Sequence, residues 1–170
     1  MKERDFAEWQ AAFPGMFDNV YCGFALPLGW TEIVWKGCQA LANIKTHQVQ
    51  VAQVKEKFGG LRFYYAEERL PPDPAQYAEE AKEWGAGYTP EYVWWADAEM
   101  GEETIERIID AMEKASYWTC ETCGTTADVT TEGGWITTKC RPCRTKLRRA
   151  QRWATRWWKF KRALKFWRKW

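Results

Sequence analysis

Four cysteines in the C-terminal third of the chain have the spacing that most clearly allows chemistry. They form two Cys-x-x-Cys pairs separated by 16 residues, Cys120 with Cys123 and Cys140 with Cys143. Four thiolates at this spacing suit one zinc ion, which accepts tetrahedral all-sulfur coordination. Because four thiolates leave no open position for water or substrate, the predicted zinc ion is structural. A redox site, an iron site and disulfides are the alternatives that the same cysteines allow.

The segment between the two cysteine pairs predicts a β-hairpin that completes a zinc ribbon. Threonine and valine precede Gly133 and Gly134, and a second extended stretch, residues 135–139, follows them. Two adjacent glycines suit the turn of such a hairpin. Gly124 is expected to take a positive φ, so that a backbone N–H group can approach a thiolate. A unit this small lacks a core of its own, so the metal is expected to hold it folded.

Other candidate ligands and catalytic motifs are sparse. Cys22, Cys38 and His47 lack paired spacing and a fourth ligand, so no second metal site is predicted. We interpret His47, the single histidine, as an ordinary surface or capped side chain. The sequence has no nucleophile elbow, Walker loop, dinucleotide-binding glycine motif or His-Glu-x-x-His motif. It therefore predicts a protein that is not an enzyme.

The last 27 residues are strongly basic and rich in aromatic side chains. Residues 144–170 contain 12 Lys or Arg and seven Trp or Phe, with no glycine, proline or acidic residue. Apolar residues recur there at spacings of three and four, which predicts an amphipathic helix. The residues expected to contact a partner are Arg148, Arg149, Arg152, Trp153, Arg156, Trp157, Trp158, Lys159, Lys161 and Arg162.

Four interpretations of this tail follow from its composition. Cations interleaved with aromatic rings can neutralise phosphates and stack on unpaired bases, which makes nucleic acid one candidate partner. The same pattern suits the acidic groove of a protein partner, or the surface of an anionic membrane. In the fourth interpretation, the tail packs on the acidic part of its own chain. The zinc ribbon directly before the tail favours nucleic acid.

The net charge of +2 conceals a strong separation of charge along the chain. Residues 1–132 contain all 23 acidic side chains and 11 basic ones, a net charge of −12. Residues 133–170 contain 14 basic side chains and no acidic one. This separation predicts an anionic partner for the C-terminus or docking of the tail on the body. Mean hydropathy is −0.61 and neither a membrane-spanning segment nor a signal peptide is evident, so a cytoplasmic location is expected.

The residues before the cysteines predict an α+β body. Apolar spacings of three and four predict helices over residues 3–13, 31–41 and 99–116, the second capped by Thr31. Alternating apolar residues predict a hairpin whose turn is Phe58-Gly59-Gly60.

Less regular segments separate these elements. Residues 16–30 and 87–95 are expected to be irregular, because they are punctuated by glycine, proline or aromatic residues. Between the hairpin and residue 87, Asp73 is expected to cap a short acidic helix that ends near Gly85.

The predicted fold is therefore α+β, with several helices on a small antiparallel sheet, an appended four-cysteine ribbon and a C-terminal basic helix. We divide the chain into an acidic body over residues 1–116, a zinc ribbon over 117–143 and a basic helical tail over 144–170.

Three stretches resemble a family of small uncharacterised proteins encoded by tailed bacteriophages and prophages. They are GFALPLGW at 23–30, VAQVKEKFGGLRFYY at 51–65 and ASYWTCETCG at 115–124, the last followed by the second cysteine pair. The acidic stretch 71–98 and the tail lie outside the resemblance. The resemblance implies a zinc-containing accessory protein of the host-cell cytoplasm, without an activity to transfer. It also implies one further class of function, the inhibition of a host factor or host defence complex.

Overall fold

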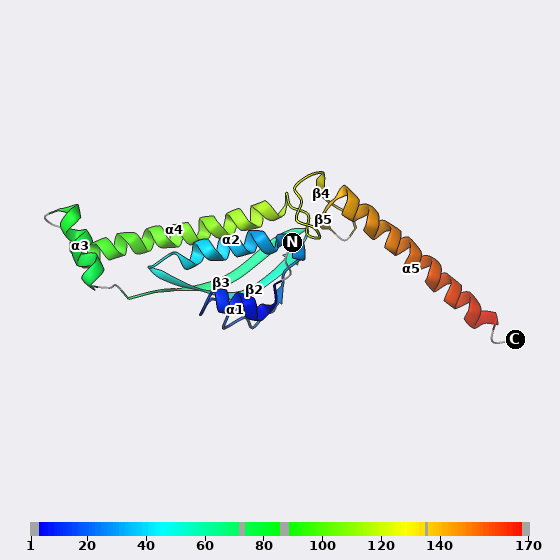
Figure 1. Ribbon diagram of the computed structural model, residues 1–170, viewed down its shortest axis with the longest axis horizontal. Coiled ribbons are helices and arrows are strands. Elements are labelled where there is room, and N and C mark those ends of the chain that lie inside the picture. The colour runs from blue at the N-terminus through cyan, green and yellow to red at the C-terminus, as the bar shows by residue number, and fades with distance from the viewer. Residues whose placement is uncertain (1–3, 72–73, 86–88, 135, 168–170) are drawn as a thin grey trace.

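The computed structural model describes residues 4–71, 74–85, 89–134 and 136–167. An α+β body lies at one end, a two-stranded ribbon follows it, and one long helix projects from the ribbon (Figure 1). The predicted α+β class is confirmed. Asp73, Trp135 and residues 168–170, which carry predictions, lie outside the described residues. The elements in chain order are α1 (Phe6–Ala12), β1 (Phe24–Ala25), the 3-10 helix η1 (Leu28–Trp30), α2 (Thr31–Ala42), β2 (His47–Lys57), β3 (Gly60–Arg69), α3 (Pro74–Trp84), α4 (Pro90–Ser116), β4 (Val129–Glu132), β5 (Thr137–Cys140) and α5 (Arg141–Trp167).

The antiparallel hairpin of β2 and β3 forms the centre of the body, as predicted. Phe58 and Gly59 connect the strands with φ angles of 54° and 75°, the backbone that a two-residue hairpin turn requires. A register shift lies between Val51 and Gln53. Because of this bulge, Val51 and Val54 are both buried, although strict alternation would place them on opposite faces.

The sheet is mixed rather than antiparallel throughout, which corrects the prediction. Phe24 and Ala25 pair in parallel with Val54 and Lys55 of β2. This third strand has two residues, and it lies in a stretch that was expected to be irregular. A strand this short has no periodicity of its own, so its pairing depends on contacts that are distant in sequence.

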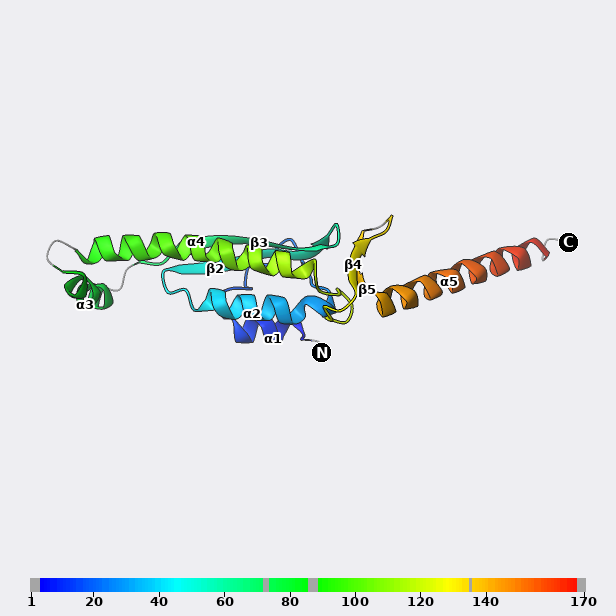
Figure 2. The same ribbon diagram turned by 90° about the horizontal axis from the view of Figure 1, so that it is seen from above.

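Two helices cover the sheet and close the core. Figure 2 shows α2 alongside α4, and α4 lies against β3. The helices approach closely at Gly37, where an added Cβ would lie 1.9 Å from the sulfur of Met112. The fully buried side chains of the core include aromatic residues from α1 and the segment after it, and aliphatic ones from α2, the sheet and α4. Examples are Trp9, Phe17, Val34, Leu41, Val51, Val54, Leu61 and Ile105.

Two helix boundaries differ from the predictions. Helix α4 begins at Pro90, so residues 90–95 are helical rather than irregular. Proline at a first helical position has the backbone angle that a helix needs, and Val93 is buried against α3. Thr31 is the first residue of α2 rather than its cap, and its hydroxyl donates to the Leu28 carbonyl instead.

Helices α3 and α4 form a second, smaller contact away from the main core. Tyr77 and Ala81 of α3 pack with Val93 and Trp94 of α4, and the Tyr77 hydroxyl donates to Asp97 over 2.9 Å. This contact lies at the end of the molecule that is opposite α5 (Figure 1). Within the described part of the chain, no helix is both long enough and apolar enough to cross a membrane.

Candidate metal centre and basic helix

The four predicted cysteines converge on one point. Their sulfur atoms all lie within 4.8 Å of one another, and those of Cys123 and Cys140 are 3.6 Å apart. A tetrahedron with metal–sulfur bonds of about 2.3 Å has sulfur–sulfur edges of about 3.8 Å. All four thiols are free rather than joined in disulfides. The cysteines are therefore positioned to bind one metal ion.

Local backbone geometry brings each pair together. The first pair lies in the loop after α4, where Gly124 has a φ of 73° and donates its N–H to the Cys120 carbonyl over 2.9 Å. The predicted positive φ is confirmed, although the N–H contacts a carbonyl rather than a thiolate. Cys140 ends β5, and Cys143 lies in the first turn of α5. The ribbon and the basic helix therefore share the second pair.

Burial and hydrogen bonds shift the pKa values of Cys120, Cys140 and Cys143 in different directions. Burial alone would raise the pKa of the Cys120 thiol, but N–H groups of Cys140, Cys123 and Thr122 lower it to about 6. Burial raises the pKa of Cys140, and it raises that of Cys143 to about 12, with contributions from the neighbouring cysteines. Of these three thiols, Cys120 therefore ionises most readily, and a bound cation would favour ionisation of Cys140 and Cys143 as well.

The ribbon docks on the body through close backbone contacts at η1. The Gly29 N–H donates to the Glu121 carbonyl over 2.8 Å, and the buried indole N–H of Trp30 donates to the Thr119 carbonyl over 2.8 Å. An added Cβ on Gly29 would lie 1.9 Å from the Cys120 carbonyl oxygen, so no larger residue fits without movement. Sequence reasoning missed this role, although Gly29 and Trp30 belong to the GFALPLGW stretch.

A second contact joins the ribbon to the β2–β3 turn. The buried Thr138 hydroxyl donates to the Gly59 carbonyl. The Thr138 carbonyl accepts the Glu121 N–H over 2.9 Å, and the Thr138 N–H donates to the Glu121 carboxylate over 3.0 Å. Glu121 pairs in addition with Lys139, so the charges nearest the knuckles are neutralised within the ribbon. These contacts hold the metal-binding loop against the body from two sides.

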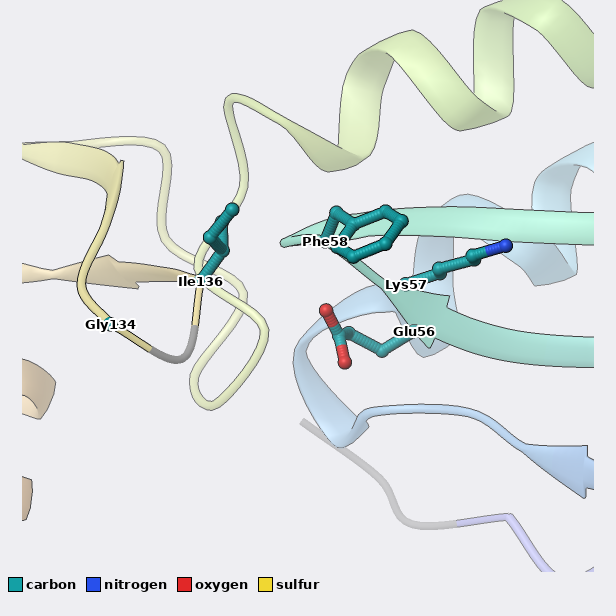
Figure 3. A pocket seen from close by; sticks show the side chains of 5 residues that line it. All are labelled: Glu56, Lys57, Phe58, Gly134 and Ile136. Carbon is teal, nitrogen blue, oxygen red and sulfur yellow. The ribbon is translucent and has the colours of Figure 1, made fainter.

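A cleft of about 400 Å³ separates the ribbon hairpin from the β2–β3 turn (Figure 3). Phe58 of the turn and Ile136 of the ribbon line it, with 65% and 41% of their surfaces exposed. Glu56, also in the wall, accepts the Gly59 N–H over 2.6 Å and so stabilises the turn. This cleft is the seam between ribbon and body.

Helix α5 leaves the ribbon in a direction that Arg144 fixes. The guanidinium of Arg144 donates to the carbonyls of Thr130 and Lys139, and it lies 3.1 Å from the Glu132 carboxylate. Its side chain is 12% exposed, in contrast to the other cations of the helix that follow. Arg144 therefore joins the helix to both strands of the ribbon.

The rest of α5 is exposed over its described side chains, from Thr145 to Lys161. Trp153 is 77% exposed, and Trp157 and Trp158 are 56% and 57% exposed. The ammonium group of Lys161 lies 3.9 Å from the centre of the Trp157 ring. The tail does not pack on the body through these residues, which removes the fourth interpretation for them. The side chain of Arg162 lies outside the described set.

The remaining candidate ligands are separate from the four cysteines. Cys22 is exposed, and Cys38 is buried in the core, where burial raises the pKa of its thiol to about 12. His47 is buried rather than on the surface, with Nδ1 3.0 Å from the Thr46 hydroxyl and Nε2 3.5 Å from Glu102. Among the described residues, the four cysteines form the only cluster suited to a metal ion.

Comparisons of the chain with protein-family models, with curated proteins and with solved structures find no match. The resemblance to phage-encoded proteins therefore depends on the quoted sequence stretches and stays a prediction.

Proposed function

We propose that this protein binds one structural zinc ion and uses α5 to bind nucleic acid, without catalysing a reaction. One observation carries the proposal. A helix of 27 residues, about 40 Å long, leaves the ribbon with exposed tryptophans, many cations and no acidic side chain. Such a helix can contact several successive phosphates along a strand.

Zinc is the metal that the four thiols favour. Soft thiolate ligands in a four-sulfur cluster suit zinc or iron, and the two short knuckles with a hairpin between them are typical of zinc ribbons. Four sulfurs fill the coordination shell of zinc, so the ion would stabilise the ribbon rather than activate water. The proposal of a non-enzymatic protein follows from this closed shell.

We expect two sides of α5 to contact different parts of a nucleic acid. Arg148, Arg152 and Arg156 recur every four residues and share one side of the helix. Trp153 and Trp157 share the other side, where Lys161 also lies over an indole. Arginine can neutralise backbone phosphates while exposed indoles stack on unpaired bases, so single strands should bind better than duplexes.

The charge distribution supports an approach by the α5 end alone. Residues 1–132 carry a net charge of −12 and repel a polyanion, whereas the charged side chains of residues 133–170 are all cationic. Because α3 and α5 lie at opposite ends of the molecule (Figure 1), nucleic acid could occupy α5 with the acidic body directed away.

The same helix also suits an anionic membrane, which is the second candidate. Its tryptophans are interleaved with cations, as in a helix at the surface of an anionic membrane. The cations on the tryptophan side favour an anionic surface over an apolar groove, although an acidic protein groove is a further alternative. The phage resemblance would place such a groove on a host factor.

One set of titrations tests these candidates. The full chain is titrated with a labelled thymidine strand, with a duplex, and with vesicles containing anionic lipid, while tryptophan emission is followed. We expect tight binding to the single strand that weakens when Arg152 and Arg156 are both replaced by glutamine. A blue shift with vesicles and no binding to either nucleic acid would refute the proposal in favour of a membrane. Retention of a stoichiometric host protein after nuclease treatment, without nucleic-acid binding, would refute it in favour of a protein partner.

A further inference from the structure

A groove between β4 and the first turns of α5 combines arginines with a competing carboxylate. Its volume is about 570 Å³, and its walls include Arg141, Arg144 and Arg148 of the helix and Thr130 and Glu132 of the strand. It lies where the ribbon meets the basic helix. The groove is therefore the natural beginning of any surface that continues along α5.

The three arginines of the groove differ in their exposure and in their hydrogen-bond and ion-pair partners. Arg144 is 12% exposed and its guanidinium donates to carbonyl groups of both ribbon strands, so it has a structural role. Arg148 is 69% exposed, and its ion-pair partner is Glu132 at the long distance of 3.7 Å. Arg141 is exposed on the same wall, and its backbone N–H donates to the Asp128 carbonyl. Among the described residues, Arg141 has no ion pair and Arg148 has only this long one, so both guanidinium groups can accept another anion.

The Glu132 carboxylate lies in this groove where a bound phosphate would meet the arginines. Its carboxylate lies 3.1 Å from Arg144 and 3.7 Å from Arg148, so it bridges two cations of the helix. Among the described residues, the ion pairs of α5 all go to Glu132. The pair of Glu132 with Arg148 is long and exposed on both sides, so it is weak and a better anion can displace Glu132 from Arg148.

We infer that the groove binds one backbone phosphate of the nucleic acid, held by Arg141 and Arg148, and that Glu132 is the anion it displaces. A phosphodiester offers two oxygens to a guanidinium fork, which matches its geometry better than a carboxylate at 3.7 Å. The inference rests on the proposed function and adds to it a defined end of the binding site and an internal competitor.

The position of the groove favours a strand of nucleic acid over a free anion. Arg148 begins the series that continues through Arg152 and Arg156 at four-residue intervals, so a phosphate in the groove is in line with phosphates farther along α5. Asp128 and Glu132 on the opposite wall repel an isolated anion, and the strand overcomes this repulsion because its other phosphates are already bound.

A double-mutant cycle on Glu132 and Arg148 tests the inference in the full chain. The variants E132Q, R148Q and the double variant are titrated with the labelled thymidine strand at fixed salt. We expect E132Q to tighten binding about two- to fivefold, the range of a released surface ion pair. R148Q should weaken binding more in the E132Q background than in the native chain, because Arg148 is then free to contact phosphate.

Controls separate the groove from general electrostatics and from the proposed function. Glu103 on α4 pairs with Arg107 at the surface of the body, so E103Q removes an equivalent charge far from the groove. Tightening by E103Q equal to that of E132Q, or additive effects of E132Q and R148Q, would overturn the inference. R141Q is a second test that leaves Glu132 in place, and it should weaken binding of the strand. Unchanged affinity in R141Q would also count against the groove. If only the Arg152 and Arg156 variants lose binding, the proposed function stands and the groove inference fails.

Discussion

Among single residues, Cys120 differs from the other knuckle cysteines in the hydrogen bonds that its sulfur accepts. Three backbone N–H groups point at it and lower the pKa of its thiol to about 6, whereas the pKa of Cys143 is raised to about 12. At neutral pH without metal, Cys120 is a thiolate and Cys143 is a thiol. Cys120 could therefore hold zinc without losing a proton, whereas Cys140 and Cys143 would each have to lose one.

Zinc binding should release protons, in amounts that depend on pH. At pH 7 the protons of Cys140 and Cys143 must leave, because both pKa values are raised. Affinity should rise with pH below about 12, and its slope should steepen by about one below pH 6, where Cys120 also holds a proton. Calorimetry in buffers of different ionisation enthalpy counts these protons. Binding without proton release would contradict the account.

Replacing Cys120 by serine should remove the metal. A serine hydroxyl is a poor zinc ligand, and three sulfurs do not close the shell, so zinc per chain should fall from one to near zero. Proteolysis between residues 117 and 143 should then accelerate, because the metal stabilises the ribbon. Cys22→Ser is the matched control, since Cys22 is exposed and separate from the cluster. Full zinc content in Cys120→Ser would show that the assignment is wrong.

Among the structural elements, the ribbon depends on two glycine-lined contacts with the body. Gly29 meets the Cys120 carbonyl, and Gly60 meets the Tyr117 ring, where an added Cβ would lie 2.5 Å from the ring. At Gly29 the missing side chain lets two backbone segments touch, and at Gly60 it makes room for the Tyr117 ring. They determine where the metal-binding loop sits on the body.

Gly29→Ala should destabilise the protein by about 1–3 kcal/mol, the usual cost of forcing a methyl group into packed atoms. The new Cβ would lie 1.9 Å from a carbonyl oxygen, and backbone cannot move aside as a side chain can. Urea unfolding measures the loss. Gly134→Ala, with nothing within 4 Å of its added Cβ, should change the free energy of unfolding little. Equal stability of both variants would contradict the proposed docking.

Arg144→Lys should loosen the direction of α5 while leaving the zinc content unchanged. Lysine keeps the charge but cannot reproduce the fork that donates to Thr130 and Lys139 carbonyls. Small-angle X-ray scattering should then show a broader distribution of long distances. The exposed Arg149, changed to lysine, is the control. An unchanged distribution in Arg144→Lys would show that other contacts orient the helix.

The sequence predicted the elements whose signals are local. The cysteine spacing, the turn at Phe58 and Gly59, and the periodicity of the tail each lie within a short stretch, and the structure contains all three. The parallel pairing of Phe24 with Val54 and the contact of Gly29 with Cys120 join distant segments. No periodicity encodes such pairings, so they could not be predicted.

The role of Arg144 was hidden for another reason. It is one of many cations in a uniform basic stretch, and its position opposite two ribbon carbonyls distinguishes it from the rest. The early start of α4 at Pro90 was missed because aromatic residues in its first turns weaken the helical signal.

In the whole molecule, charge is separated along the long axis. The acidic helix α3 lies at one end, the acidic helix α4 runs from there along the body to the ribbon, and α5 projects from the ribbon to the other end (Figure 1). Association with a polyanion should therefore be oriented by the field of the protein, with α5 leading. The metal-stabilised ribbon would then serve to hold α5 away from the acidic body.

The salt dependence of binding to a single strand tests the central claim most directly. If the seven cations among the predicted contact residues each neutralise one phosphate, log Kobs should fall linearly with log salt, with a slope of about −5. The full chain is titrated with a labelled thymidine strand at a series of salt concentrations. A steep linear decrease is the predicted result. Absence of binding at low salt, or an affinity that does not change with salt, would contradict the account.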